Sequence, residues 1–83
     1  MNLFKRKVAV IGSGSWATAI VKILSDNLPS IYWWVREPEV IESVQNNGRN
    51  CMYLSSVAID PKHVKVSNDL VKTVSKADII IMV

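Results

Sequence analysis

The chain has 83 residues and a mass of 9.3 kDa, so it has room for one small domain at most. Hydrophobic residues make up 49% of the sequence and charged residues 20%, which excludes intrinsic disorder. The net charge is +3, but only the cluster Lys5-Arg6-Lys7 concentrates basic residues, so we expect no nucleic-acid-binding face. The apolar run from Ile79 to Val83 is far shorter than the roughly 20 residues that span a bilayer, so we expect no membrane partner.

The first strand–helix unit is predicted by a change of period. Residues 7–11 form a short run rich in β-branched residues that ends at Gly12, as in a strand buried on both faces. From Trp16 onward the apolar residues recur at helical spacing, and Asp26, Asn27 and Pro29 end the helix. The residues of that apolar helix face are Ala17, Ile20, Val21 and Leu24.

Two further units follow with the same alternation. Residues 30–35 predict a strand, Pro38 suits the first turn of a helix, and Asn47-Gly48 supplies its end. Residues 49–62 show no period and are expected to form a loop. Residues 63–67 alternate as a short strand does, and Ser67 or Asn68 can cap a helix that carries Leu70, Val71 and Val74. Asp69 and Asp78 are expected to bind backbone at a helix start and a strand entry, and residues 79–83 predict a last strand.

The order β-α-β-α-β-α-β predicts an α/β fold with a Rossmann-type, doubly wound parallel sheet. Because the last predicted strand would need helices on both faces, we expect residues 1–83 to be the N-terminal portion of a Rossmann domain. The rest of that domain and a C-terminal helical substrate domain would follow residue 83. Uncovered apolar faces and an open strand edge would then make this piece prone to self-association.

Residues 12–17 carry the chemical motif, which is G-x-G-x-x-A between a strand and a helix. Gly12 permits the tight turn, Gly14 lets a pyrophosphate approach the backbone, and the small Ala17 lets the helix pack closely on the strand. The first-turn amides near Ser15 and Trp16 form an anion site with the helix dipole. We therefore predict dinucleotide binding; the alternative is a glycine-rich turn with no ligand. Trp16 either lines the cofactor cleft or simply packs.

The end of the second predicted strand is the second place where a cofactor contact is expected, because an acid often binds the cofactor ribose there. Arg36 occupies this place and could pair with a 2′-phosphate or stack on adenine, whereas Glu37 could accept from a ribose hydroxyl. We favour a site that tolerates NADPH; the alternative is that both are exposed turn charges.

Other conspicuous residues are expected to be structural. His63 is predicted to lie at the surface, Trp33 and Trp34 in the core rather than in a ligand-stacking site, and Cys51 to be an inert thiol. One cysteine forms no internal disulfide, which fits a reduced, cytoplasmic setting. The sequence holds no metal-ligand spacing and no Ser/His/Asp arrangement.

These segments resemble the opening of the bacterial-type NAD(P)-dependent glycerol-3-phosphate dehydrogenases. The resemblance rests on Val10-Ile-Gly-Ser-Gly-Ser-Trp-Ala-Thr-Ala19, Trp34-Val35-Arg36, Asn50-Cys-Met-Tyr-Leu54, Ser67-Asn-Asp-Leu70 and Ala77-Asp-Ile-Ile80, and it covers essentially the whole chain. Ala17 replaces a usual glycine, and Ser55 replaces a usual proline; neither departure removes a ligand-contacting group.

The resemblance implies a nicotinamide cofactor, NAD(P)H, contacted by Ser15, Trp16 and Arg36. It implies reversible hydride transfer between the cofactor and dihydroxyacetone phosphate, giving sn-glycerol 3-phosphate for phospholipid synthesis. It places the catalytic lysine beyond Val83, so this piece alone is expected to be inactive, and it suggests a cytoplasmic homodimer. Two alternatives stay open: another two-domain NAD(P)-dependent reductase, of the 2-hydroxyacid or ketopantoate type, or a non-catalytic NAD(H)-sensing module.

Overall fold

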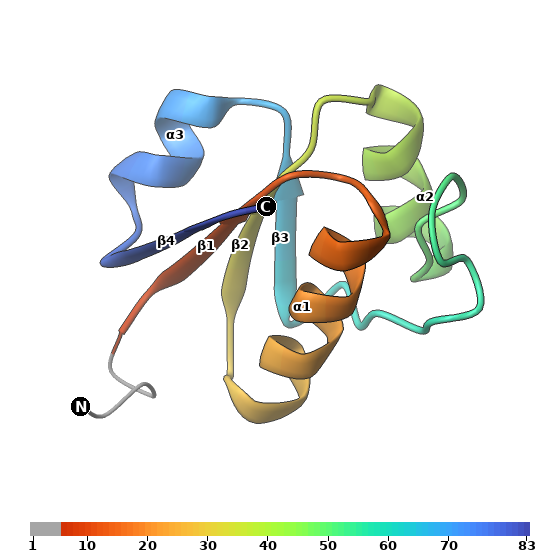
Figure 1. Ribbon diagram of the computed structural model, residues 1–83, viewed down its shortest axis with the longest axis horizontal. Helices are drawn as coiled ribbons and strands as arrows, with labels where there is room; N and C mark the ends of the chain where they lie inside the picture. The colour runs from red at the N-terminus through yellow and green to blue at the C-terminus, as the bar shows by residue number, and fades with distance from the viewer. Residues whose placement is uncertain (1–5) are drawn as a thin grey trace.

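The computed structural model describes residues 6–83 (Figure 1), so Lys5 of the predicted basic cluster lies outside the described residues. Strands and helices alternate through them as expected. Their bounds are β1 (Val8–Ile11), α1 (Ser15–Asn27), β2 (Ile31–Trp34), α2 (Pro38–Asn47), β3 (Val64–Ser67), α3 (Leu70–Ser75) and β4 (Ile79–Met82).

The strands form one parallel sheet in the order β3-β2-β1-β4. This confirms the predicted α/β class and the doubly wound, Rossmann-type architecture. The strands are shorter than predicted by a residue at one or both ends, and α1 begins at Ser15 rather than at Trp16. Because the chain moves from β1 outward to β3 and then crosses to β4, the carboxyl end of β1 is a topological switch point.

One face of the sheet, covered by α1 and α2, holds the hydrophobic core. Register pairs Val10 with Trp33 of β2, which in turn pairs with Val66 of β3, so these side chains share this face. Trp33 and Val10 are fully buried there with Ala17 and Val21 of α1 and with Val40 and Val44 of α2. Burial of each large apolar side chain contributes about 1.5–3 kcal/mol, so this face provides most of the hydrophobic stabilisation.

The opposite face is covered by the short helix α3, which Figure 1 shows apart from α1 and α2. Tyr32 and Trp34 of β2 lie on it and are half-buried. β4 is an edge strand whose burial alternates, with Ile80 and Met82 exposed by 45% and 77%. The expected uncovered apolar face and open strand edge are therefore found here, within the described residues. The exposed face reflects the small area that a helix of six residues can cover, and the open edge reflects the place of β4 at the end of the strand order.

The helix ends follow simple capping chemistry. α2 ends at Asn47, and Gly48 follows in the left-handed conformation with φ +68°, which turns the chain out of the helix, as the Asn47-Gly48 pair predicted. The Gly48 N–H donates to the Val44 carbonyl at 3.0 Å. α3 is capped by Asp69, whose carboxylate accepts from the Lys72 N–H at 3.0 Å. The prediction of Ser67 or Asn68 as the cap is therefore wrong. The Ser67 hydroxyl instead accepts from the Asp69 N–H, in the turn that precedes the helix. Asp78 accepts from the Lys7 N–H at 2.9 Å at the entry of the sheet, as expected.

The segment between α2 and β3 has neither helix nor strand, as predicted for residues 49–62. Ile59 anchors it, because its side chain is buried in the core and its N–H donates to the Gly48 carbonyl at 2.6 Å. Across residues 6–83, no helix combines the length and apolar character needed to cross a membrane.

Candidate functional site

The glycine loop, residues 12–14, leaves β1 at the switch point and leads directly into α1. Two backbone hydrogen bonds hold the start of this loop against the neighbouring strands. The Gly12 N–H donates to the Trp34 carbonyl at 3.1 Å, and the Val83 N–H donates to the Ile11 carbonyl at 3.1 Å. The start of α1 is therefore held at the carboxyl edge of the sheet, where open α/β sheets bind their ligands.

Gly12 is required by the fold itself. Its φ is +140°, a conformation that side chains rarely adopt, and an added Cβ would lie 3.2 Å from the Val83 carbonyl oxygen and 3.5 Å from the Ala17 Cβ. Its carbonyl accepts a 2.6 Å hydrogen bond from the indole Nε1 of Trp33. Gly12 thus makes the turn predicted for it, and the small, fully buried Ala17 makes the predicted close helix–strand contact.

Gly14 is glycine for a different reason. It is the N-cap of α1 with φ −72° and ψ −173°, an extended conformation open to any residue. An added Cβ would meet no atom within 4 Å. Neither backbone strain nor a protein neighbour therefore requires a glycine here, and the missing side chain leaves open space directly beside the helix N-terminus.

The N-terminus of α1 is uncapped and exposed. No side chain caps it and its first turn holds no acid, so within residues 6–83 the N–H groups of Ser15 and Trp16 have no protein acceptor. The aligned peptide dipoles of this 13-residue helix add positive potential at the same place. Trp16 is 78% exposed, so simple packing does not explain it. The predicted residues Gly12, Gly14, Ser15 and Trp16 are thus brought together in a form that fits a pyrophosphate.

Arg36 and Glu37 follow β2 and behave differently. Arg36 is exposed, so its guanidinium is accessible at the carboxyl edge. Glu37 is half-buried, and its Oε2 accepts from the Ser13 hydroxyl at 3.1 Å. Glu37 is therefore not an exposed turn charge, because it braces the glycine loop. The Glu37 Oε1 and the Trp34 Nε1 are buried without a hydrogen-bond partner among the described residues. One acceptor and one donor are therefore unsatisfied near the end of β2.

Asn50 is the residue that sequence reasoning missed as part of the site. It is fully buried, and its Nδ2 donates to the Ser13 carbonyl at 3.0 Å and to the Thr18 hydroxyl at 2.9 Å. In the sequence, Asn50 stands out only as the first residue of the Asn50-Cys-Met-Tyr-Leu54 segment, which is part of the family resemblance. That segment is the available signal, since the surrounding stretch has no period and gives no sign of burial.

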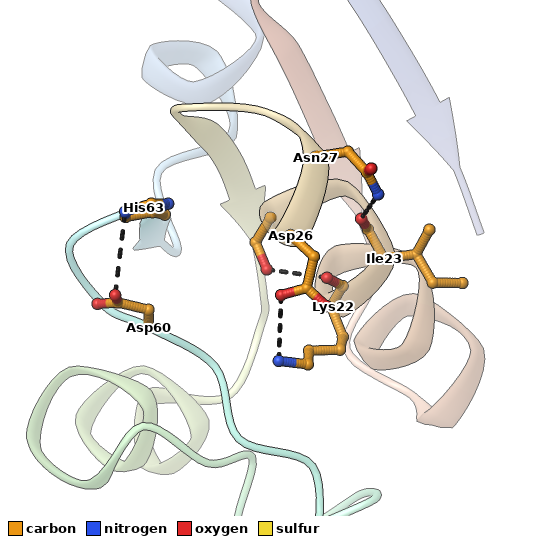
Figure 2. A network of polar contacts seen from close by, with 7 residues as sticks. Lys22, Ile23, Asp26, Asn27, Asp60 and His63 are labelled. Atoms are coloured by element: carbon orange, nitrogen blue, oxygen red, sulfur yellow. Dashed lines mark hydrogen bonds and ion pairs between the residues drawn. The ribbon is translucent and has the colours of Figure 1, made fainter.

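The remaining conspicuous residues lie away from the loop. His63 is an exposed residue 3.9 Å from the Asp60 carboxylate, just before β3 and hence at the opposite edge of the sheet (Figure 2). The same figure shows the C-terminal turns of α1, where Lys22 pairs with Asp26 at 3.2 Å and the Asn27 amide donates to the Ile23 carbonyl. These contacts stabilise the helix end and have no role at the glycine loop.

The tryptophans of β2 differ in burial, and the inertness expected of Cys51 stays a prediction. Trp33 is a core residue, as predicted, and Trp34 is half-buried on the other face. Cys51 is an exposed free thiol. A shallow cavity of about 170 Å³ lies between β2, β3 and α3, and Tyr32, Lys65, Lys72 and Lys76 are among its lining residues. It is separate from the glycine loop, where the candidate site is an open surface at a helix end.

Comparison with protein families gives one match over nearly the whole chain. Residues 7–83 fit the model of the family described as NAD-dependent glycerol-3-phosphate dehydrogenase N-terminus. A glycerol-3-phosphate dehydrogenase (NAD(P)+) from Parvibaculum lavamentivorans is 31% identical over 83 residues, which is 100% of this chain and 24% of that protein. One from Pseudomonas fluorescens is 35% identical over 75 residues, or 90% of this chain and 22% of that protein.

A solved structure agrees with both. The crystal structure of glycerol-3-phosphate dehydrogenase from Coxiella burnetii superposes with a TM-score of 0.77 and 25% sequence identity, covering 95% of this chain and 24% of that one. The chain therefore spans about a quarter of the length of the relatives it matches.

Proposed function

We propose a function from one premise: the chain belongs to the NAD-dependent glycerol-3-phosphate dehydrogenase N-terminus family, as its motifs had led us to expect. On this proposal the chain binds the pyrophosphate and adenosine of NAD(P)H for an enzyme that interconverts dihydroxyacetone phosphate and sn-glycerol 3-phosphate. The enzyme would thereby supply a precursor of phospholipids.

The observation that carries the proposal is the unfilled space at Gly14. A residue with ordinary φ and no neighbour within 4 Å of its missing Cβ needs to be glycine only if something outside the described chain approaches. The uncapped N–H groups beside it favour an anion. A pyrophosphate satisfies both conditions, because its oxygens accept from these amides and its bulk fills the space of a side chain.

Each residue of the loop has a separate part in this binding. The backbone N–H groups of Ser15 and Trp16 would donate to the pyrophosphate, and the exposed indole of Trp16 would cover the bound cofactor. Gly12 and Ala17 would act indirectly, by holding α1 against β1 so that its first turn faces the ligand.

The adenosine end would lie beyond β2. The Oε2 of Glu37 accepts from Ser13 and its Oε1 is buried, so the exposed guanidinium of Arg36 is the accessible group that could pair with a 2′-phosphate or stack on adenine. This supports a site that accepts NADPH as well as NADH.

The cofactor, when bound, supplies hydride transfer to or from the substrate carbon, and the chain supplies binding and orientation. The catalytic lysine and the contacts to the substrate phosphate are proposed to lie beyond residue 83. The organisation into a Rossmann domain followed by a helical substrate domain stays a prediction. Homodimerisation and a cytoplasmic location also belong to the proposal and rest on the family resemblance alone.

The test uses the protein encoded by the full reading frame. The absorbance of NADH and NADPH is followed with and without dihydroxyacetone phosphate. We expect oxidation that depends on this substrate. Cofactor binding without turnover of dihydroxyacetone phosphate, but with turnover of another ketone, would point to a different two-domain reductase. Cofactor binding with no turnover of any ketone would favour a sensing module.

A further inference from the structure

Asn50 is buried in a place where an amide side chain is tolerated only if its hydrogen bonds are satisfied. Both polar atoms of the Asn50 side chain are hydrogen-bonded. The Nδ2 donates to the Ser13 carbonyl and the Thr18 hydroxyl, while the Oδ1 accepts from the N–H groups of Met52 and Tyr53 at 3.0 and 3.1 Å. One side chain thus ties the glycine loop, the first turn of α1 and the loop after α2 together.

The bond to Ser13 fixes the direction of a peptide group. In a planar trans peptide the C=O and the N–H point in opposite directions. Since the Ser13 carbonyl points at Asn50, the Gly14 N–H of the same peptide points away from Asn50. If this peptide flipped, the carbonyl would be presented in place of the N–H, and a carbonyl oxygen repels a phosphate.

The hydrogen bond to Thr18 fixes the direction of the next peptide group, between Gly14 and Ser15. The Thr18 hydroxyl accepts from Asn50 and donates to the Gly14 carbonyl at 2.9 Å, and the Thr18 N–H donates to that carbonyl at 3.0 Å. The Gly14 carbonyl is therefore held along the helix axis, so the Ser15 N–H of that peptide points out of the helix end.

We propose that Asn50 is a positioning residue for the dinucleotide, which holds the Ser13–Gly14 and Gly14–Ser15 peptides with their N–H groups toward the pyrophosphate. The proposal rests on the function proposed above, since it needs a ligand at the start of α1. It also explains why an asparagine lies buried beneath this loop: only an amide offers two donors to Ser13 and Thr18 together with an acceptor for the following loop.

The first experiment compares variants of the protein encoded by the full reading frame by their affinity for ADP-ribose, measured by NMR titration up to millimolar ligand. Asn50→Ala removes the whole network, and Thr18→Val removes only the hydroxyl that links Asn50 to Gly14. We expect Asn50→Ala to weaken binding by about tenfold or more, by analogy with the loss seen when the hydrogen-bond partners of metal ligands are removed. Thr18→Val is expected to weaken it less, but measurably.

The matched control is Ser43→Ala. Ser43 is also buried, and its hydroxyl donates to the Arg49 carbonyl, one residue before Asn50, without touching the glycine loop. Its removal is expected to lower the melting temperature while ADP-ribose affinity changes less than about twofold. If Ser43→Ala and Asn50→Ala weaken binding equally, Asn50 only supports the fold and the proposal is wrong.

A measurement on the unaltered chain decides the matter if Asn50→Ala does not fold. The side-chain amide protons of Asn50 are expected to shift during the ADP-ribose titration, with the same midpoint as the Ser15 and Trp16 backbone amides. Those of Asn27, bonded at the far end of α1, are expected to stay in place. Shifts at Ser15 and Trp16 without any at Asn50 would overturn the proposal alone, whereas no binding at all would overturn the proposed function as well.

Discussion

Gly12 and Gly14 belong to the same turn, yet the chain needs them for different reasons. Gly12, on the strand side, has φ +140° and lies against the end of β4, so the fold alone demands it. Gly14, on the helix side, has an ordinary φ and open space where its side chain would be. The turn is therefore fixed on its strand side and open on its helix side.

The same difference extends beyond the two glycines. The strand side is built from contacts within the chain, such as the Trp33 indole on the Gly12 carbonyl. The helix side presents groups that the described chain does not use, including the first-turn amides and the exposed Trp16. Residues of the first kind should therefore control stability, and residues of the second kind should control binding.

Placing the same side chain at both glycines gives the largest expected difference. Gly12→Ser should destabilise the chain by about 1–3 kcal/mol, because a residue with a Cβ is strained at this φ and would crowd the Val83 carbonyl at 3.2 Å. Thermal or urea unfolding followed by circular dichroism measures the change. A Gly12→Ser variant as stable as the unaltered chain would show that the strand side does not require glycine.

Gly14→Ser should leave the stability of the chain intact and weaken ligand binding. Serine is a favoured N-cap and meets no neighbour here, so the stability should stay the same or rise by a few tenths of a kcal/mol. The added side chain occupies the space of the pyrophosphate, and ADP-ribose affinity should fall by about tenfold, equivalent to about 1.4 kcal/mol. Unfolding and NMR titration of the same sample check both halves. Unchanged affinity would mean that no ligand uses this space.

Arg36→Ser should give the smallest effect and should act on one cofactor only. The exposed guanidinium can pair with the 2′-phosphate of NADPH, and an exposed pair of this kind contributes up to about 1 kcal/mol. The ratio of NADPH to NADH affinity should therefore drop by about fivefold, with no change in stability, and the drop should shrink at high salt. Equal losses for the two cofactors would instead indicate stacking of Arg36 on the adenine.

The fold was predictable because its signals are local. The alternation of β-branched runs with helical stripes predicted each strand and helix, and Asn47-Gly48 predicted the end of α2. The errors lie at the ends, where several polar residues compete. Ser67, Asn68 and Asp69 are all able to cap a helix, and only the geometry of the β3–α3 connection selects Asp69.

The candidate site was predictable only where it is contiguous in sequence. Residues 12–17 form one motif with a known spacing, so their juxtaposition required no tertiary information. The supports of the loop come from far along the chain: Glu37 reaches Ser13 across 24 residues, and Asn50 reaches it across 37. No local pattern distinguishes a buried, fully bonded asparagine from one in a solvated loop, which is why Asn50 was seen as a motif letter rather than as a part of the site.

A titration of the unaltered protein encoded by the full reading frame with ADP-ribose, followed by the backbone amide resonances, tests most directly whether the N-terminus of α1 binds the dinucleotide. We predict that the Gly14, Ser15 and Trp16 amides shift together and saturate with one dissociation constant. If these resonances stay in place, or if the shifts cluster instead around Lys65 and Lys76 at the cavity beside α3, the start of α1 is not the dinucleotide site.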